Sequence, residues 1–279
     1  MGKRTFTSLT AENFRHPLDK QATQSLQQIP GLDFLLRATL FPVASQFFHL
    51  DNLASAIQVG PKQLSKLYSL HKEACSVLDI EVPQLYVRQN PVPNAYTFAV
   101  NNRQSFVVIH TSLLELLTEE ETQAVIAHEL GHLKCEHSVY LTIANLLIMA
   151  AGQLPRIGVV LERPLRMQML EWVRCAEFTC DRAALLVAQD PRVVMSLLMK
   201  LSGGSPSLMA ELDLDSFIDQ ARHYEESSKD PLGKAIRLAQ TIERTHPVPV
   251  LRAKEIDRWF QSPGYKKIYE GDYLARPAV

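Results

Sequence analysis

The sequence of 279 residues lacks an excess of positive charge. Its 29 lysines and arginines are balanced by 30 aspartates and glutamates, which leaves a formal net charge of −1 at pH 7. A nucleic-acid-binding surface needs clustered basic side chains to attract phosphate groups, and no run of lysine or arginine marks one here. We therefore expect no nucleic-acid partner.

Cysteine is scarce, and its spacing shows no disulfide framework. The four cysteines stand at positions 75, 135, 175 and 180, without a CxxC pair. This usage is typical of a reducing compartment. We expect the four side chains to pack as small apolar residues.

Long apolar runs are missing as well. A membrane-spanning helix needs ~20 apolar residues, whereas the stretch 32–50 contains Pro42 and the stretch 139–154 contains Asn145. The first residues show no apolar core of a signal peptide. We expect buried or interfacial helices, with docking on a lipid surface as the alternative. The expected location is the cytoplasm or a plastid-like compartment, without secretion.

The strongest positive signal is the run HELGH at residues 128–132. In a helix, His128 and His132 return to nearly the same face, displaced by ~6 Å along the axis, so both imidazoles can reach one metal ion. Glu129 projects beside this pair, where its carboxylate can take a proton from the attacking water. Taken singly, each histidine has the simpler explanation of a buried, hydrogen-bonded side chain.

A third metal ligand is expected on a later helix. Catalytic zinc keeps three protein ligands and one open position, and Glu177 and Asp181 fall on the apolar stripe of this helix, where an unpaired carboxylate is costly. We expect Glu177 to bind the metal and Asp181 to accept the free ring N–H of a ligand histidine. The alternative is a buried ion pair with Arg174 or Arg182.

Four segments in the same order resemble one peptidase family. HELGH and the later AEFTCDRAA, residues 176–184, are similar to the HExxH…ExxxD signature of the HtpX/Oma-type peptidases, which are CAAX-processing-related gluzincins. Asn94-Ala95-Tyr96 resembles the family's segment before the metal helix, and His246-Pro247 with Arg252 resembles its late His-Pro…Arg element. Within the family, the sequence is most similar to the plastid and cyanobacterial branch.

The resemblance implies how the substrate is held. It implies that an edge strand beginning near Asn94 and Ala95 pairs with an extended protein or peptide substrate. An ordinary turn residue is the alternative for Asn94. The chain continues with Thr97 and Phe98 where the family often has a glycine, which leaves the shape of the cleft at this edge open.

The late element carries two further expectations. The resemblance implies that His246 steadies the developing oxyanion, while the simpler reading is a histidine that ends a helix before Pro247. Arg252 is expected to be a structural cation that faces Glu177 or Asp181.

The pattern of turns and apolar residues predicts a mostly helical α+β fold of zincin type, with a small sheet whose edge strand flanks the metal helix. Thr118 and Glu121 have the form of a capping box at the start of that helix. Pro164 is expected in the first turn of the later ligand helix. The predicted strands are 84–89, 96–100 and 105–111, with a hairpin turn at 101–104, and the predicted later helices are 164–187, 191–201, 213–224 and 247–260. We expect an N-terminal helical extension at 1–60, a peptidase domain at 61–262 and a tail at 263–279.

These observations predict a zinc-dependent endopeptidase with one Zn²⁺ per chain. The ligands are His128, His132 and Glu177, and Glu129 is the general base with His246 beside it. Two alternatives remain open at this point. One is a non-catalytic metal-binding scaffold, and the other is a zinc hydrolase of a non-peptide amide or ester.

Overall fold

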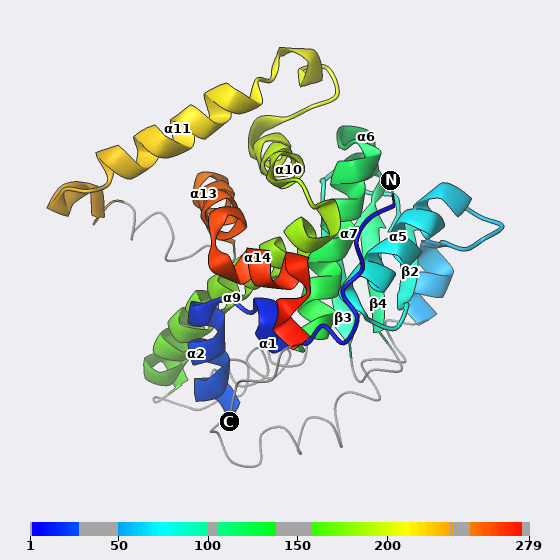
Figure 1. Cartoon of the computed structure of the whole chain (residues 1–279), viewed down its shortest axis with the longest axis horizontal. Coiled ribbons are helices and arrows are strands. Elements are labelled where there is room, and N and C mark those ends of the chain that lie inside the picture. The colour runs from blue at the N-terminus through cyan, green and yellow to red at the C-terminus, as the bar shows by residue number, and fades with distance from the viewer. Residues whose placement is uncertain are drawn as a thin grey trace.

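A computed structural model describes residues 2–27, 50–99, 105–137, 158–234, 236 and 246–274. These residues form a mostly helical structure with one small sheet, as the sequence predicts (Figure 1). The helices that precede and contain the HELGH run are α5 (Ser65–Leu78), α6 (Thr111–Leu116) and α7 (Glu119–Lys134). The later ones are α9 (Gly158–Ala188), α10 (Pro191–Gly203), α11 (Leu214–Ser227), α13 (Pro249–Gln261) and α14 (Pro263–Glu270), with short 3-10 turns at Met209–Glu211 and Asp272–Leu274.

The sheet contains β1 (Ile57–Gln58), β2 (Gln84–Arg88), β3 (Ala95–Ala99) and β4 (Ser105–His110), in the order β1-β2-β4-β3. The three predicted strands are confirmed to within one residue, whereas β1 was not predicted because two residues carry too little pattern. The pair β3 and β4 is antiparallel, from Ala95 opposite Ile109 to Ala99 opposite Ser105. The expected turn at 101–104 lies outside the described residues. Within this sheet β3 is an edge strand.

The capping box at the start of α7 is confirmed. The Thr118 hydroxyl accepts from the Glu121 backbone N–H, and the Glu121 carboxylate accepts from the Thr118 N–H at 2.8 Å. The same carboxylate accepts from Ser196, at 2.7 Å, and Lys200, at 2.6 Å. The acidic first turn of α7 therefore also attaches α10 to this helix.

Helix α7 is the central element of the structure. It contacts α5, α9, α10 and the strands β3 and β4, and it lies near the centre of the view in Figure 1. Gly131 allows the close approach of α9, since a Cβ at this position would lie 3.0 Å from the Cβ of Ala183 and 3.1 Å from the Cα of Cys180. The backbones of α7 and α9, which carry the predicted metal ligands, can therefore approach each other closely at Gly131.

The prediction for the start of α9 is wrong. The helix begins at Gly158, so Pro164 lies inside it and not in its first turn. A proline inside a helix costs about 3 kcal/mol, which is small enough for the packing of a 31-residue helix to offset. The predicted helices at 191–201, 213–224 and 247–260 are confirmed as α10, α11 and α13, each with ends shifted by up to three residues.

Both ends of the described chain join the main hydrophobic core. The N-terminal residues form α1 (Ala11–Phe14) and α2 (Pro17–Gln27). Phe6 and Phe14 belong to the same buried cluster as Tyr265 and Ile268 on α14. The division of the chain at residues 60 and 262 stays a prediction.

The described cysteines form no disulfide, and the described helices include no candidate membrane span. All four cysteines are free, and three of them are buried. The stretches 32–49 and 139–154 lie outside the described residues. In the part of the chain that the structure describes, no helix has the length and apolar character needed to cross a membrane.

Candidate metal centre

Two helices bring the three predicted metal ligands together. His128 and His132 lie one turn apart on α7, and Glu177 lies on α9 with 2% of its surface exposed. The Nε2 atom of His128 is 3.3 Å from Glu177 Oε2, and the Nε2 atom of His132 is 3.3 Å from Glu177 Oε1. Two imidazole nitrogens therefore face two carboxylate oxygens.

The Nδ1 atom of each histidine contacts another side chain, so the Nε2 atoms are the ones available to a metal. The Nδ1 atom of His128 is 3.1 Å from Asp181 Oδ1, and that of His132 is 3.2 Å from His137 Nδ1. Among the described residues, no hydrogen bond is made by the buried Oε2 of Glu177. Nitrogen and carboxylate donors that converge in this way are a suitable set for zinc.

Arg252 on α13 contacts the two carboxylates of this cluster. Its guanidinium donates to both oxygens of Asp181, at 2.8 Å and 2.6 Å, and its Nη1 lies 3.4 Å from Glu177 Oε2. The expected contact with Glu177 or Asp181 is thus present. Arg182, a candidate partner in the ion-pair alternative, instead donates to the carbonyls of Phe14 and Arg15.

Electrostatics favour positive charge between the carboxylates. Burial alone would lower the pKa of His128, but Glu177 and Asp181 outweigh it and raise this pKa to about 10. Burial would likewise raise the pKa of Glu177, yet His128 and Arg252 hold it well below its usual range. The centre therefore keeps an ionised carboxylate that calls for a cation.

The predicted base, Glu129, lines a pocket together with the predicted ligands His128 and Glu177. Glu129 is buried, and burial raises its pKa against the opposing effect of His132 and His128. The pocket has a volume of 520 Å³ and also includes Glu177 and His246 in its lining. A carboxylate with a raised pKa accepts a proton more readily than an ordinary one.

The remaining predicted residues line the same pocket. Asn94 and Ala95 line it at the start of β3, and the Asn94 carbonyl accepts from the His110 N–H at 3.0 Å, which extends the β3–β4 pairing. His246 lies at the rim with 59% of its side chain exposed, and its Nε2 is 3.5 Å from Glu177 Oε1. The apolar part of the wall is formed by Leu113, Val125, Leu197 and Leu201.

Sequence reasoning missed two residues behind His132. His137 is fully buried, and its Nε2 is 3.0 Å from Asp19 Oδ2 on α2. Burial alone would raise the pKa of Asp19, but His137, Arg15 and Thr179 lower it to about 2. His137 belongs to the run HELGHLKCEH, but its partner Asp19 is 118 residues away along the chain, so no local pattern connects the two.

Cys180 offers a competing ligand set. Possible ligand atoms of His128, His132 and Cys180 lie within 4.8 Å of one another. Burial raises the pKa of the Cys180 thiol well above its usual range, so the protonated form is favoured, and its Sγ lies 3.6 Å from His137 Nδ1. Glu177, in contrast, is ionised and faces both Nε2 atoms.

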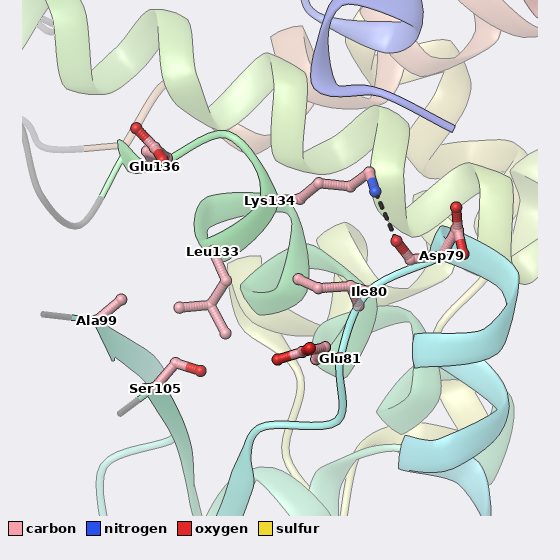
Figure 2. Close-up of a pocket in the computed structure, with 8 residues that line it drawn as sticks. All are labelled: Asp79, Ile80, Glu81, Ala99, Ser105, Leu133, Lys134 and Glu136. Atoms are coloured by element: carbon pink, nitrogen blue, oxygen red, sulfur yellow. Dashed lines mark hydrogen bonds between the residues drawn. The ribbon is translucent and has the colours of Figure 1, made fainter. Parts of the chain in front are cut away.

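A second pocket, of 340 Å³, lies at the far end of α7 (Figure 2). Its lining includes Asp79, Glu81, Lys134 and Glu136 but none of the predicted site residues. The Lys134 ammonium donates to the Asp79 carbonyl at 2.8 Å. With no histidine or cysteine in its lining, this pocket offers no comparable chemistry.

Three known proteins are similar to this chain. A 54% identity over 263 residues links the chain to the "Plastoglobule-localized metallopeptidase 48, chloroplastic" of Arabidopsis thaliana, covering 94% of this chain and 76% of that protein. The "Protease HtpX homolog 2" of Methanosarcina mazei is 27% identical over 191 residues, covering 58% of this chain and 64% of that protein. The crystal structure of S. mikatae Ste24p has a TM-score of 0.49 and 17% identity, covering 86% of this chain and 62% of that one.

The family itself is identified by a match over most of the chain. The model of peptidase family M48 matches residues 61–260, which include the HELGH run, Glu177 and Arg252. The resemblance to HtpX-type peptidases is thereby confirmed. The chain belongs to peptidase family M48, a family of metallopeptidases.

Proposed function

We propose that this chain is a zinc-dependent endopeptidase in which His128, His132 and Glu177 hold one zinc ion. One observation carries the proposal: both histidine Nε2 atoms face the Glu177 carboxylate at 3.3 Å, while both Nδ1 atoms are engaged by other side chains. Membership of a metallopeptidase family supports the same conclusion. When bound, zinc acidifies water and polarises a carbonyl group.

Glu129 is the general base in this proposal. It lies one residue from His128 and lines the pocket, where a water approaching the scissile carbonyl meets its carboxylate. Burial raises the pKa of Glu129, which favours a carboxyl group that takes a proton in one step and returns it in the next. Glu129 accepts the proton of the attacking water and then delivers it to the departing amine.

His246 donates to the developing oxyanion. Its Nε2 lies 3.5 Å from Glu177 Oε1, the oxygen that His132 also faces, and His246 lines the pocket. Glu177 would raise the pKa of His246, but burial and the charge of Arg252 act in the opposite direction, and this pKa is lowered. A neutral imidazole still carries one N–H donor, which is sufficient for this role.

A peptide is the substrate that best fits the surroundings of Glu129. Ala95 opens the edge strand β3 and lines the pocket together with Asn94. An extended peptide can pair with such an edge through backbone hydrogen bonds, while its side chains meet the apolar wall. A small non-peptide amide or ester would use neither feature.

The general-base assignment is tested by Glu129→Gln. We expect cleavage of a fluorescence-quenched casein to fall by about 10² to 10⁴-fold, with the zinc content of the purified protein unchanged. Glu120→Gln, an exposed residue on the same helix, is the matched control and should cleave normally. Normal cleavage by Glu129→Gln would show that the base is misassigned.

The ligand set is tested by comparing Glu177→Gln with Cys180→Ala. We expect Glu177→Gln to lose bound zinc in metal analysis, because a neutral amide replaces the ionised donor between the two Nε2 atoms. Cys180→Ala should keep it. The reverse result would move the third ligand to the cysteine.

The setting of the enzyme is part of the proposal. The Arabidopsis relative is named as chloroplastic and plastoglobule-localized. We extend to this chain a plastid-like or cytoplasmic location with peripheral contact to a lipid surface. Flotation with lipid vesicles tests the contact, and recovery of all the protein in the lipid-free fraction would refute it.

A further inference from the structure

We infer that Asp19 and His137 are positioning residues that hold the metal ligand His132 in its binding tautomer. This inference rests on the proposed zinc ligation. Its consequence is that α2, which lies outside the residues 61–260 matched by the family, contributes to the metal centre. No sequence motif pointed to Asp19.

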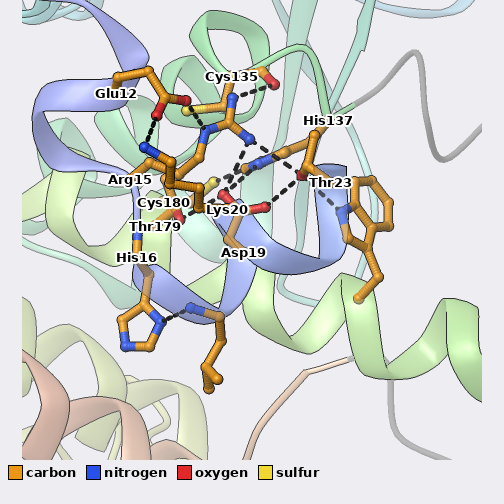
Figure 3. A network of polar contacts seen from close by, with 12 residues as sticks. Glu12, Arg15, His16, Asp19, Lys20, Thr23, Cys135, His137, Thr179 and Cys180 are labelled. Carbon is orange, nitrogen blue, oxygen red and sulfur yellow. Dashed lines mark hydrogen bonds and ion pairs between the residues drawn. The ribbon is translucent and has the colours of Figure 1, made fainter. Parts of the chain in front are cut away.

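Asp19, His137 and His132 form a continuous buried line, and Figure 3 shows its Asp19–His137 part. Asp19 Oδ2 is 3.0 Å from His137 Nε2, and His137 Nδ1 is 3.2 Å from His132 Nδ1. Asp19 and His137 are both 0% exposed, and His132 is 8% exposed. Solvent therefore has little access to the hydrogen bonds that fix these rings.

The carboxylate at the end of the line is firmly held. Figure 3 shows Asp19 surrounded by the side chains of Arg15, Thr23, His137 and Thr179. Its Oδ2 accepts from the Thr179 hydroxyl at 2.7 Å and lies 3.4 Å from Arg15 Nη1, while its Oδ1 accepts from the Thr23 hydroxyl at 3.0 Å. An ionised carboxylate with these partners acts only as an acceptor.

Counting donors and acceptors then assigns every proton on the line. Because Asp19 only accepts, His137 Nε2 carries a hydrogen and donates it. A neutral imidazole has one donor and one acceptor, so His137 Nδ1 must accept. Two groups face this nitrogen, His132 Nδ1 at 3.2 Å and the Cys180 thiol at 3.6 Å. The nearer group donates, because two lone pairs would otherwise face each other, and His132 Nδ1–H leaves the lone pair on His132 Nε2, the atom that faces Glu177. The tautomer is the one that metal ligation requires.

The two histidines therefore differ in how their Nδ1 atoms are connected to a carboxylate. His128 reaches a carboxylate directly, since Asp181 Oδ1 is 3.1 Å from its Nδ1. His132 reaches one only through the intervening ring of His137. A carboxylate that orients a ligand imidazole is a common device at metal sites, and losing such a partner typically weakens metal affinity 10 to 100-fold, by about that factor here.

The test compares two substitutions of His137 by zinc affinity, measured in competition with a chromophoric chelator. His137→Phe removes both the acceptor and the donor, and we expect zinc binding to weaken by about 10 to 100-fold. His137→Gln restores an acceptor oxygen and a donor nitrogen, and it should recover most of this loss. A purely structural role would not separate the two variants in this way.

Controls separate positioning from loss of the fold. His71→Phe removes another buried histidine, on α5, and should bind zinc like the wild type. Circular dichroism of each zinc-free variant monitors folding. If His137→Phe does not fold, Asp19→Asn replaces it, and about 10-fold weaker zinc binding is expected because an amide is a poorer anchor for His137.

The outcomes are distinguishable. Wild-type zinc affinity in the folded His137→Phe protein, or in Asp19→Asn where that protein does not fold, overturns the inference. Equal losses in folded His137→Phe and His137→Gln also overturn it. If Glu177→Gln loses zinc while His137→Phe does not, only the positioning role fails. If Glu177→Gln keeps zinc, the proposed ligand set fails instead.

Discussion

At the scale of single residues, two buried histidines show how surroundings decide the charge of a side chain. His71 is 1% exposed, its Nε2 makes no hydrogen bond among the described residues, and burial lowers its pKa to about 4. His128 is almost as buried, yet Glu177 and Asp181 raise its pKa to about 10. The nearby carboxylates, and not the depth of burial, therefore set the pKa values of these two histidines apart.

His71 gives a prediction for the pH dependence of stability. Its folded pKa, about 4, lies below the unfolded value of 6.5, so the unfolded state binds the proton more readily. The contribution of neutral His71 to the free energy of unfolding is fully present above pH 6.5. It is lost as the pH falls toward 4, which lowers the free energy of unfolding by about 3 kcal/mol in total. In His71→Phe, the free energy of unfolding should therefore decline less over this range. Urea unfolding between pH 4 and 7, with chelator in both samples, measures the difference, and parallel curves would contradict it.

At the scale of elements, the contact of α7 with α9 sets the geometry of the metal centre. The two helices carry His128 and His132 on one side and Glu177 and Asp181 on the other. Gly131, inside the HELGH run, is where their backbones come closest. A shift of a few tenths of an ångström here would move the ligands of both helices relative to one another.

Gly131→Ala tests this contact. The added Cβ would lie 3.1 Å from the Cα of Cys180, a backbone atom that cannot rotate away. The helix-propensity gain of about 1 kcal/mol is then outweighed by overpacking of about 1 to 3 kcal/mol. We expect a lower urea midpoint and weaker zinc binding.

A glycine in open space is the control for this substitution. Gly203 ends α10, and no atom lies within 4 Å of its would-be Cβ. Gly203→Ala should therefore leave the urea midpoint and zinc binding unchanged or slightly improved. Equal behaviour of the two alanine variants would show that the approach of α9 does not matter.

At the scale of the whole molecule, elements far apart in the sequence converge on one centre. Helix α2 supplies Asp19, α7 and α9 supply the proposed ligands, and α13 supplies Arg252. Arg252 on α13 contacts both Asp181 and Glu177, and it lies 71 residues from Asp181 along the chain. Metal binding should therefore stabilise the entire fold and not one helix pair.

Metal removal tests this whole-molecule coupling. At zinc concentrations 100 times the dissociation constant, a ligand of the native state adds about 2.7 kcal/mol, which corresponds to a rise in Tm of roughly 5 to 10 °C for a chain of this size. Chelator should abolish the rise, and Glu177→Gln should show none. The two observations come from thermal unfolding followed by circular dichroism. An equal rise in Glu177→Gln would place the stabilising metal elsewhere.

The sequence by itself determined the features that depend on local spacing. The capping box of α7, the pairing of β3 with β4 and the one-turn separation of His128 and His132 follow from periods of 3.6 and 2 residues, which neighbouring residues fix. The carboxylates Glu177 and Asp181 stood out because charge on an apolar stripe needs a partner.

Only the tertiary structure decided which distant groups meet. The closeness of α7 and α9 depends on Gly131, and Asp19 joins His137 across 118 residues. Such contacts are set by how helices pack, and no local pattern records them. The predicted metal ligands and Asp181 can therefore be nominated from spacing, whereas the contacts of Asp19 and His137 with His132 follow from packing alone.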